Sequence, residues 1–186
     1  VLLLIDSLTR TARALREIGL AAGEPPTRRG YPSSVYPALP QLIERAGRGE
    51  KGDITAVYTV LIEGDGEGDP IAEEVRSLTD GHIMLSPSLA EAGHYPAIDI
   101  PTSLSRIMPA VTDQAHISAA ARLRHHLAKY REIEILLQVG EYKPGGDADA
   151  DAAVKAKPRI DKFLQQGRDD VTPRDDLIKA LTEAIK

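Results

Sequence analysis

The first six residues constrain the fold more than any other stretch of the chain. Val1 to Ile5 form an unbroken apolar run that ends at the carboxylate of Asp6. Such a strand has both faces buried, which is typical of a central strand in a parallel sheet. A helical pattern follows at once, so we expect Asp6 at the carboxyl end of the strand, where open α/β sheets bind ligands. The alternative is a plain core strand whose aspartate caps the next helix.

Composition narrows the function classes. The 186 residues include 42% hydrophobic and 27% charged residues, which is ordinary for a globular protein. The formal net charge of −5 provides no basic field of the kind that indicates a nucleic-acid partner. Cysteine is absent, which excludes disulfides and thiolate metal sites. Because Val1 is not an initiator methionine and already reads as strand, we expect further sequence upstream.

Strand and helix patterns alternate along the first half of the chain, which indicates an α/β layer. A helix is predicted from Leu8 to Ile18, with Ser7 as its N-cap and Gly19 as its end. Residues 23–32 are rich in proline and glycine and predict a long loop. The other expected elements are strands at 54–62 and 82–85 and helices at 35–46, 70–78 and 88–92.

Two acidic stretches imitate ligand-binding loops. Glycine alternates with carboxylates over 63–69, but the acids would repel phosphate, and Pro70 and Arg76 stand where an EF-hand needs glycine and glutamate. The acidic run at 147–151 lacks the same calcium ligands. We therefore expect a flexible acidic loop in the first case and the start of a helix in the second.

From about residue 109 the pattern becomes helical. Apolar residues spaced three and four apart predict a long amphipathic helix from Gln114 to Val139. The adjacent His125 and His126 lack metal-ligand spacing, and we expect these and the other histidines at the surface. Shorter helices are expected at 158–166 and 173–185.

Six short motifs occur in order along the chain: VLLLIDS, PPTRRGYP, AVYTVLIEGD, AEEVRSLTDGHI, HYPAID and SLSRIM. Together they resemble the export ATPases of type III secretion and flagellar assembly, which are related to the catalytic subunits of rotary ATP synthases. The resemblance implies the α/β part of a RecA-like P-loop ATPase core with a mainly parallel sheet over residues 1–108. A C-terminal all-α helical domain is implied over residues 109–186.

The resemblance assigns catalytic roles to three residues. Asp6 is similar to the strand-end aspartate that orders Mg²⁺ through water, and Arg10 is similar to an arginine that faces the γ-phosphate. Arg106 resembles the arginine finger that a ring subunit inserts into its neighbour's site. A guanidinium suits this task because it stays charged and presents a planar fork of donors. Solvent exposure for Arg10 and a structural salt bridge for Arg106 are the alternatives.

The implied cofactors are ATP and Mg²⁺, and three further residues are expected in nucleotide binding. Ser7 follows the strand-end aspartate, Tyr58 resembles a tyrosine near the phosphates, and Tyr95 resembles the ring that stacks on adenine. Packing in the core is the alternative for Tyr58, and a turn position before Pro96 is the alternative for Tyr95.

The chain lacks two parts that ATP hydrolysis needs. No G-x-x-x-x-G-K-[ST] motif occurs in the 186 residues, and the glutamate that polarises the attacking water in this family is also missing. We therefore expect the chain to be the C-terminal portion of a longer ATPase and to be inactive by itself. Unpaired strand edges predict poor solubility for the isolated piece.

The resemblance also implies the setting of the parent protein. It would form a homohexamer in the cytoplasm, peripheral to the inner membrane, and use ATP to release chaperones from export substrates and unfold them. Stalk and regulator proteins of the export apparatus are the other implied partners. The alternatives are a flagellar export ATPase, a ring helicase or RNA translocase, and a non-catalytic assembly module. The negative charge and the lack of a basic, aromatic-interleaved stretch argue against nucleic acid.

Overall fold

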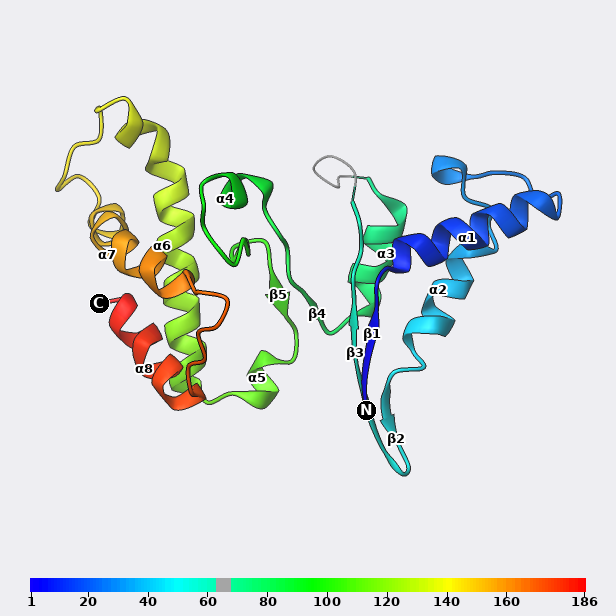
Figure 1. The fold of residues 1–186 in the computed structure, drawn as a ribbon. Coiled ribbons are helices and arrows are strands. Elements are labelled where there is room, and N and C mark those ends of the chain that lie inside the picture. Colours follow the sequence, from blue (N-terminus) through cyan, green and yellow to red (C-terminus); the bar gives the residue numbers. More distant parts are fainter. Residues whose placement is uncertain (63–67) are drawn as a thin grey trace. The chain divides into compact units, whose positions relative to one another are not determined.

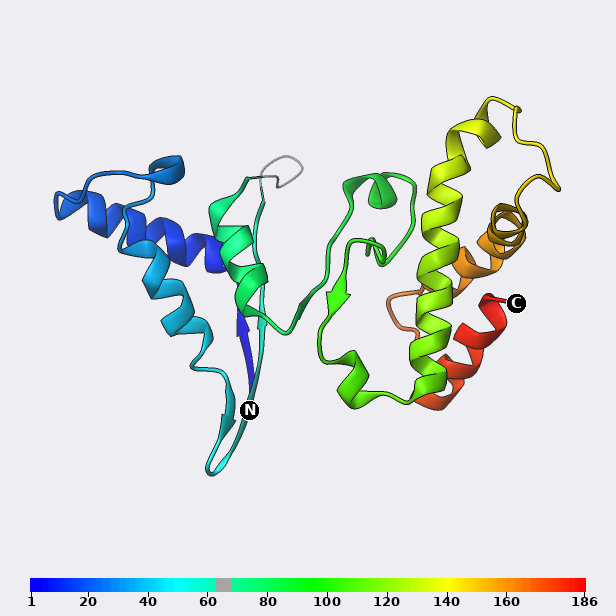
Figure 2. The same cartoon turned by 180° about the vertical axis from the view of Figure 1, so that it is seen from behind.

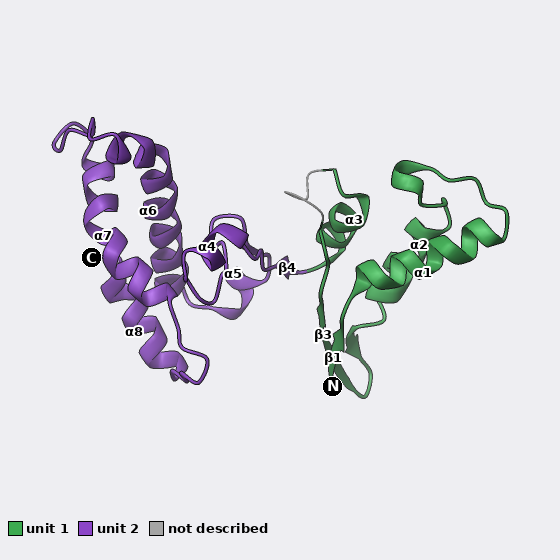
Figure 3. Cartoon of the chain, turned by 45° about the horizontal axis from the view of Figure 1, so that its top comes forward, with its two compact units in different colours: residues 1–79 green, residues 80–186 purple. Residues whose placement is uncertain are grey.

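The computed structural model describes residues 1–62 and 68–186 (Figure 1, and from behind Figure 2). It divides into two compact units, Val1–Thr79 and Asp80–Lys186, which are coloured separately in Figure 3. The acidic loop expected at 63–69 lies largely outside the described residues. Within those residues, no helix combines the length and the apolar character that crossing a membrane requires.

Unit 1 combines a small sheet with helices. Its elements in chain order are β1 (Leu2–Ile5), α1 (Leu8–Ala21), the 3₁₀ turn η1 (Arg28–Gly30), α2 (Val35–Ile43), β2 (Gly47–Gly49), β3 (Gly52–Tyr58) and α3 (Pro70–Leu78).

The sheet of unit 1 is mixed, with the strand order β1-β3-β2. β1 runs parallel to β3, with Ile5 opposite Tyr58, whereas β2 and β3 form an antiparallel hairpin. The expectation of a mainly parallel sheet is therefore right for one of these two pairings. A local turn joins β2 directly to β3, and such short connections produce antiparallel neighbours.

β1 is an edge strand here, and the expected burial on both faces is wrong for this structure. Leu2 is 63% and Leu4 67% exposed, and Val57 on β3 is 52% exposed. Leu4 lies opposite Val57 in the parallel register, so these side chains share one face of the sheet. No element among the described residues pairs with the free edge of β1 or buries this face.

The core of unit 1 lies where the three α-helices meet the other face of the sheet. Its fully buried members include Leu8 of α1, Leu39 of α2 and Ile71 of α3. Ile5 of β1 and Tyr58 of β3 pack against this cluster. Burial of these side chains fixes the sheet against the helices and thereby positions the loops at the ends of the strands.

Helix α1 begins as the sequence predicts and ends later. The side chain of Ser7 caps it by accepting a hydrogen bond from the backbone N–H of Arg10. Gly19 does not end it, because the helix continues to Ala21. Instead, Gly19 is buried, and a Cβ there would lie 2.9 Å from Cγ of Pro32. Glycine at this position lets the helix approach the proline-rich loop closely.

Unit 2 contains two short strands and a group of helices. In chain order they are β4 (Gly81–His82), α4 (Pro87–Glu91), β5 (Leu104–Ser105), α5 (Met108–Val111), α6 (Gln114–Gln138), α7 (Ala148–Leu164) and α8 (Arg174–Ala184). β4 pairs with β5 in antiparallel fashion. The strand expected at 82–85 is thus shorter than predicted and belongs to a separate two-stranded sheet.

The long helix α6 agrees with the predicted bounds to within one residue. Helix α7 begins at Ala148 with the side chain of Asp147 as its cap, as expected for the acidic run at 147–151. The separate helix expected at 158–166 is instead the second half of α7, which contains Pro158. A stripe of buried small and aliphatic residues holds α7 together through the proline, which has no N–H to donate. These residues are Ala150, Ala153, Ala156 and Ile160.

His126 corrects the expectation that the histidines lie at the surface. His126 is only 5% exposed and lies inside the helical part of unit 2. Its neighbour His125 is exposed. Neither ring nitrogen of His126 has a hydrogen-bond partner among the described residues. On a helix, adjacent residues point in different directions, so one can be buried while the other faces solvent.

Candidate functional site

Two polar residues meet where β1 and β3 end. Asp6 follows β1, and Thr59 follows β3. Because the two strands are parallel, their carboxyl ends lie at the same edge of the sheet. The hydroxyl of Thr59 donates a hydrogen bond of 2.7 Å to Oδ1 of Asp6. Asp6 is exposed, and its Oδ2 makes no hydrogen bond or ion pair within the described residues, so one carboxylate oxygen remains available to a ligand.

The start of α1 is fastened to the same edge. Ser7 is 2% exposed, and its Oγ accepts from the backbone N–H of Arg10 at 3.3 Å. The backbone N–H of Leu8 donates to the carbonyl of Thr59 at 3.0 Å. Thr9 uses its hydroxyl both as donor and as acceptor toward the backbone of Leu61, at 3.2 and 2.9 Å. These bonds hold the helix N-terminus beside Asp6, and its partial positive charge favours an anion there.

Arg10 and Tyr58 occupy different surroundings. Arg10 is exposed on the first turn of α1, and its backbone N–H donates to the capping hydroxyl of Ser7. Tyr58 is half-buried against the core of unit 1, and its hydroxyl donates to the carbonyl of Ile43 at 3.3 Å. Burial raises the pKa of this phenol. The ring of Tyr58 thus adopts the core-packed position that the sequence left open, with its hydroxyl at the end of α2.

The other two predicted site residues belong to unit 2. The ring of Tyr95 is exposed, at 57% for the residue, and its carbonyl accepts from the backbone N–H of Gln166 at 2.8 Å. The segment after α7 therefore lies against this tyrosine. Arg106 is exposed and follows β5, and its backbone N–H donates to the carbonyl of Asp80 at 2.8 Å. Asp6, Ser7 and Arg10 are thus brought together in unit 1, whereas Tyr95 and Arg106 lie in unit 2.

The donors at the sheet edge fit a hydrated Mg²⁺ better than a protein-enclosed metal. Within the described residues, no group of three or more His, Asp or Glu side chains gathers at one place. Mg²⁺ is commonly bound through one or two carboxylates, with water and substrate phosphates completing its shell. The exposed carboxylate of Asp6, held on one oxygen by Thr59, matches that pattern.

Thr59 is a site residue that the sequence reasoning missed. Thr59 lies inside the strand predicted at 54–62, whereas the observed strand β3 ends at Tyr58, so the sequence pattern did not show that Thr59 stands at a strand end. Parallel pairing of these two strands would have placed Thr59 level with Asp6. The sequence pattern alone did not establish which strands are neighbours.

Both parts of the chain match models of known protein families. Residues 1–105 match the nucleotide-binding domain of the ATP synthase alpha/beta family. Residues 112–183 match the C-terminal domain of the type III secretion ATPase EscN. The chain belongs to the type III secretion and flagellar ATPases of the ATP synthase alpha/beta family. The resemblance drawn from the six motifs is therefore confirmed.

Curated relatives of this ATPase family are similar over almost the whole chain. A type 3 secretion system ATPase of Sinorhizobium fredii is 60% identical over 172 residues, which are 92% of this chain and 38% of that protein. A flagellum-specific ATP synthase of Pseudomonas aeruginosa is 52% identical over 91% of this chain and 38% of that protein. The chain thus spans less than half the length of these relatives.

Solved structures of secretion ATPases share the fold. The assembled ATPase EscN of enteropathogenic E. coli superposes with a TM-score of 0.96 and 48% identity, covering all of this chain and 45% of that one. The same ATPase in complex with its central stalk EscO gives a TM-score of 0.89, 47% identity and coverage of 100% and 44%. The nucleotide-binding part with its small mixed sheet and the helical part are thus recognisable in this chain.

Proposed function

We propose that this chain is the C-terminal portion of a homohexameric ATPase that energises type III protein secretion. Residues 1–108 would complete the nucleotide-binding domain, and residues 109–186 would form the helical domain. The observation that carries the proposal is the exposed Asp6 carboxylate at the carboxyl edge of β1, hydrogen-bonded to Thr59 in a chain of this family. The phosphate-binding loop and the water-polarising glutamate would be supplied by the rest of the protein.

In this proposal the residues of unit 1 orient the phosphate end of ATP. Asp6 would hold Mg²⁺ through its water shell, and the metal would supply positive charge to the phosphates. Ser7 keeps the N-terminus of α1 aimed at this edge, and the exposed guanidinium of Arg10 lies one turn along the same helix. Tyr58 would support the site by packing against the core of unit 1 at the end of β3.

Unit 2 would supply two further groups. The exposed ring of Tyr95 offers a flat apolar surface on which adenine can stack. Arg106 would act as an arginine finger in the site of the adjacent subunit. Charge spreads over the γ-phosphoryl group in the transition state, and a planar guanidinium stabilises it from the side that faces the neighbour. This role supports a ring in which each site needs two subunits.

The relatives support a ring and a stalk partner. The EscN structures contain an assembled ATPase and a complex with a central stalk, so we propose a ring that binds a stalk protein. Secretion chaperones, export substrates and a regulator are the other proposed partners, at the cytoplasmic face of a bacterial inner membrane. The flagellar export ATPase is the second candidate, because a flagellum-specific relative is 52% identical. Secretion relatives reach 60%, which favours the virulence-type system.

The arginine finger is tested by Arg106→Ala in the full-length protein. We expect kcat for ATP to fall by roughly 10³-fold or more, because the finger acts on the transition state. Binding of a fluorescent ATP analogue should stay within about twofold, since a group acting only in the transition state adds nothing to ground-state affinity. Arg106→Lys, which keeps the charge without the planar fork, should recover little of the activity. A near-normal kcat for Arg106→Ala would remove the finger from the mechanism.

A further inference from the structure

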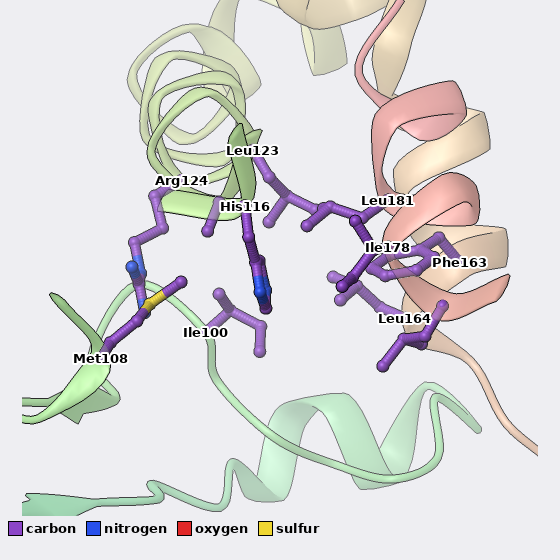
Figure 4. A pocket seen from close by; sticks show the side chains of 11 residues that line it. Ile100, Met108, His116, Leu123, Arg124, Phe163, Leu164, Ile178 and Leu181 are labelled. Atoms are coloured by element: carbon purple, nitrogen blue, oxygen red, sulfur yellow. The ribbon is translucent and has the colours of Figure 1, made fainter. Parts of the chain in front are cut away.

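A cavity of about 240 Å³ lies within unit 2, among α6, α7, α8 and the segment before them (Figure 4). Its walls are mostly aliphatic or aromatic, and two basic side chains join them, Arg124 and His116, both from α6. None of the six residues proposed for the nucleotide site lines it. The apolar side chains around it are Ile100, Met108, Ala120, Leu123, Phe163, Leu164, Leu177, Ile178 and Leu181.

The size of the cavity limits its occupant. Sites for cofactors and drug-sized ligands usually enclose about 300 to 1,000 Å³, so a nucleotide or a similar cofactor does not fit. A single branched aliphatic side chain does fit. Protein partners commonly anchor themselves through one such side chain that enters a desolvated pocket, while the surrounding contacts exclude water.

The described residues that line the cavity include a positive charge and no carboxylate. Arg124 is half-buried, and within the described part of the chain its guanidinium makes no ion pair or hydrogen bond. Its neighbours along the cavity wall include no carboxylate among the described residues. Arg174 adds a second cation on the face of α8 that carries Leu177 and Ile178, since residues three and four apart share a helix face.

His116 contributes a donor to the same wall. Its Nδ1 is buried and has no hydrogen-bond partner within the described residues. An imidazole ring carries at least one N–H, so His116 offers a hydrogen-bond donor beside the cavity. The cavity therefore has an apolar lining with hydrogen-bond donors and a positive charge beside it. A ligand group complementary to these donors is a carboxylate.

We propose that this cavity is a docking site for a partner protein, which inserts a leucine-like side chain and places an adjacent carboxylate against Arg124. The inference goes beyond the ATPase function and does not depend on it. The partner segment is acidic and amphipathic, because one side of it must fill the cavity and the next residue must meet the guanidinium. Burial of the leucine-like side chain supplies most of the affinity. The ion pair with Arg124 makes the site specific for partner segments that carry an acidic residue beside this side chain.

The test uses matched dipeptide probes on the full-length ATPase with labelled Ile and Leu methyl groups. Acetyl-Leu-Glu-amide should shift the methyl resonances of Ile178 and Leu181 in a saturable way. Acetyl-Leu-Gln-amide, equal in shape and uncharged, should bind about fivefold more weakly, which corresponds to roughly 1 kcal/mol for a partly exposed ion pair. Acetyl-Ala-Glu-amide, which lacks the anchor, should cause no saturable shift.

Two substitutions separate the cavity from the charge. Arg124→Gln should retain binding of the Leu probes and abolish the preference for Glu over Gln, whereas Arg122→Gln, on an exposed neighbour outside the cavity wall, should leave the preference intact. Ala120→Leu should fill the cavity and abolish binding of both Leu probes. The proposal is overturned if no saturable shift occurs, as when a second copy or another segment of the same protein fills the cavity. It is equally overturned if the Glu and Gln probes bind alike.

Discussion

Thr59 and Asp6 are joined by a hydrogen bond of 2.7 Å between the hydroxyl and Oδ1, across the ends of two parallel strands. The bond fixes the carboxylate rotamer at an exposed position where solvent would otherwise leave it mobile. It also occupies one oxygen and leaves the other for a ligand. Thr59 is thus a positioning residue for the proposed magnesium site.

Replacement of Thr59 tests this relationship. In the full-length ATPase, Thr59→Val keeps the shape and removes the donor, so we expect kcat to fall by about 10-fold or more, as for other supporting residues of metal sites. The Mg²⁺ concentration needed for half-maximal activity should rise. Thr59→Ser, which keeps the hydroxyl, should stay near the wild-type value in both measurements. An unchanged Mg²⁺ dependence in Thr59→Val would show that Asp6 needs no such support.

A second prediction concerns the connection between α6 and α7. Tyr142 donates a hydrogen bond of 2.6 Å to Asp151 Oδ1, and the backbone N–H of Gly145 donates to the other oxygen at 2.8 Å. The hydrogen bond to Asp151 raises the pKa of Tyr142 to about 12. Since the ordinary pKa is near 10, this interaction stabilises the folded state fully below about pH 10 and is lost as the pH rises toward 12.

Tyr142→Phe should therefore remove a tyrosine that titrates near pH 12 from an absorbance titration of the full-length protein. Hydrogen exchange of the backbone amides between residues 139 and 147 should become faster, because the hydroxyl that holds the loop to α7 is gone. Tyr36→Phe is the matched control, as Tyr36 bonds only a backbone carbonyl in unit 1. Equal exchange in the loop of Tyr142→Phe and wild type would contradict the clamp.

Acid sensitivity of the helical unit is a third prediction. Burial lowers the pKa of His126, and the positive charges of Arg122 and His125 lower it further, while the backbone of Ile185 and the carboxylate of Asp149 oppose the shift. A depressed pKa means that the folded state binds fewer protons than the unfolded state. The resulting stability is present above the ordinary histidine pKa of about 6.5 and is lost as the pH falls below it.

Amide protection factors for α6 in the full-length protein, compared at about pH 7.5 and about pH 5.5, measure this effect on either side of the histidine pKa. They should fall with pH in the wild type and fall less in His126→Leu, which cannot be protonated. His125→Gln, at the exposed neighbour, should keep the wild-type acid response. If His126→Leu loses protection as steeply as the wild type, another group controls the transition.

The sequence predicted best those elements whose signals are local. The bounds of α6, the Ser7 cap and the start of α3 after Asp69 each depend on neighbouring residues, and all three occur in the structure. Gly19 failed as a helix end because its reason is a contact with Pro32 in a distant loop. The acidic run at 147–151 starts a helix as expected, but Pro158 does not begin a second one, because the buried face of α7 outweighs the loss of one backbone hydrogen bond.

The candidate site was predictable in part for the same reason. Asp6 could be placed at a sheet edge because a strand pattern ends there, and its position after β1 is as expected. Thr59 could not be assigned to the site from the sequence, because its role depends on β3 being the parallel neighbour of β1. The burial of His126 was likewise missed, since the faces of α6 are decided by α7 and α8 packing against it.

The central claim is that Asp6 and Arg106 serve the same ATP from two different subunits. ATPase activity of mixed rings measures this directly, with full-length Asp6→Asn subunits combined with Arg106→Ala subunits, each inactive when alone. Wild-type subunits combined with the doubly substituted protein provide the control for subunit mixing. We predict that the mixed rings regain activity, because some interfaces pair an intact Asp6 with an intact Arg106. Mixed rings that stay inactive, while the control shows that subunits exchange, would contradict the account.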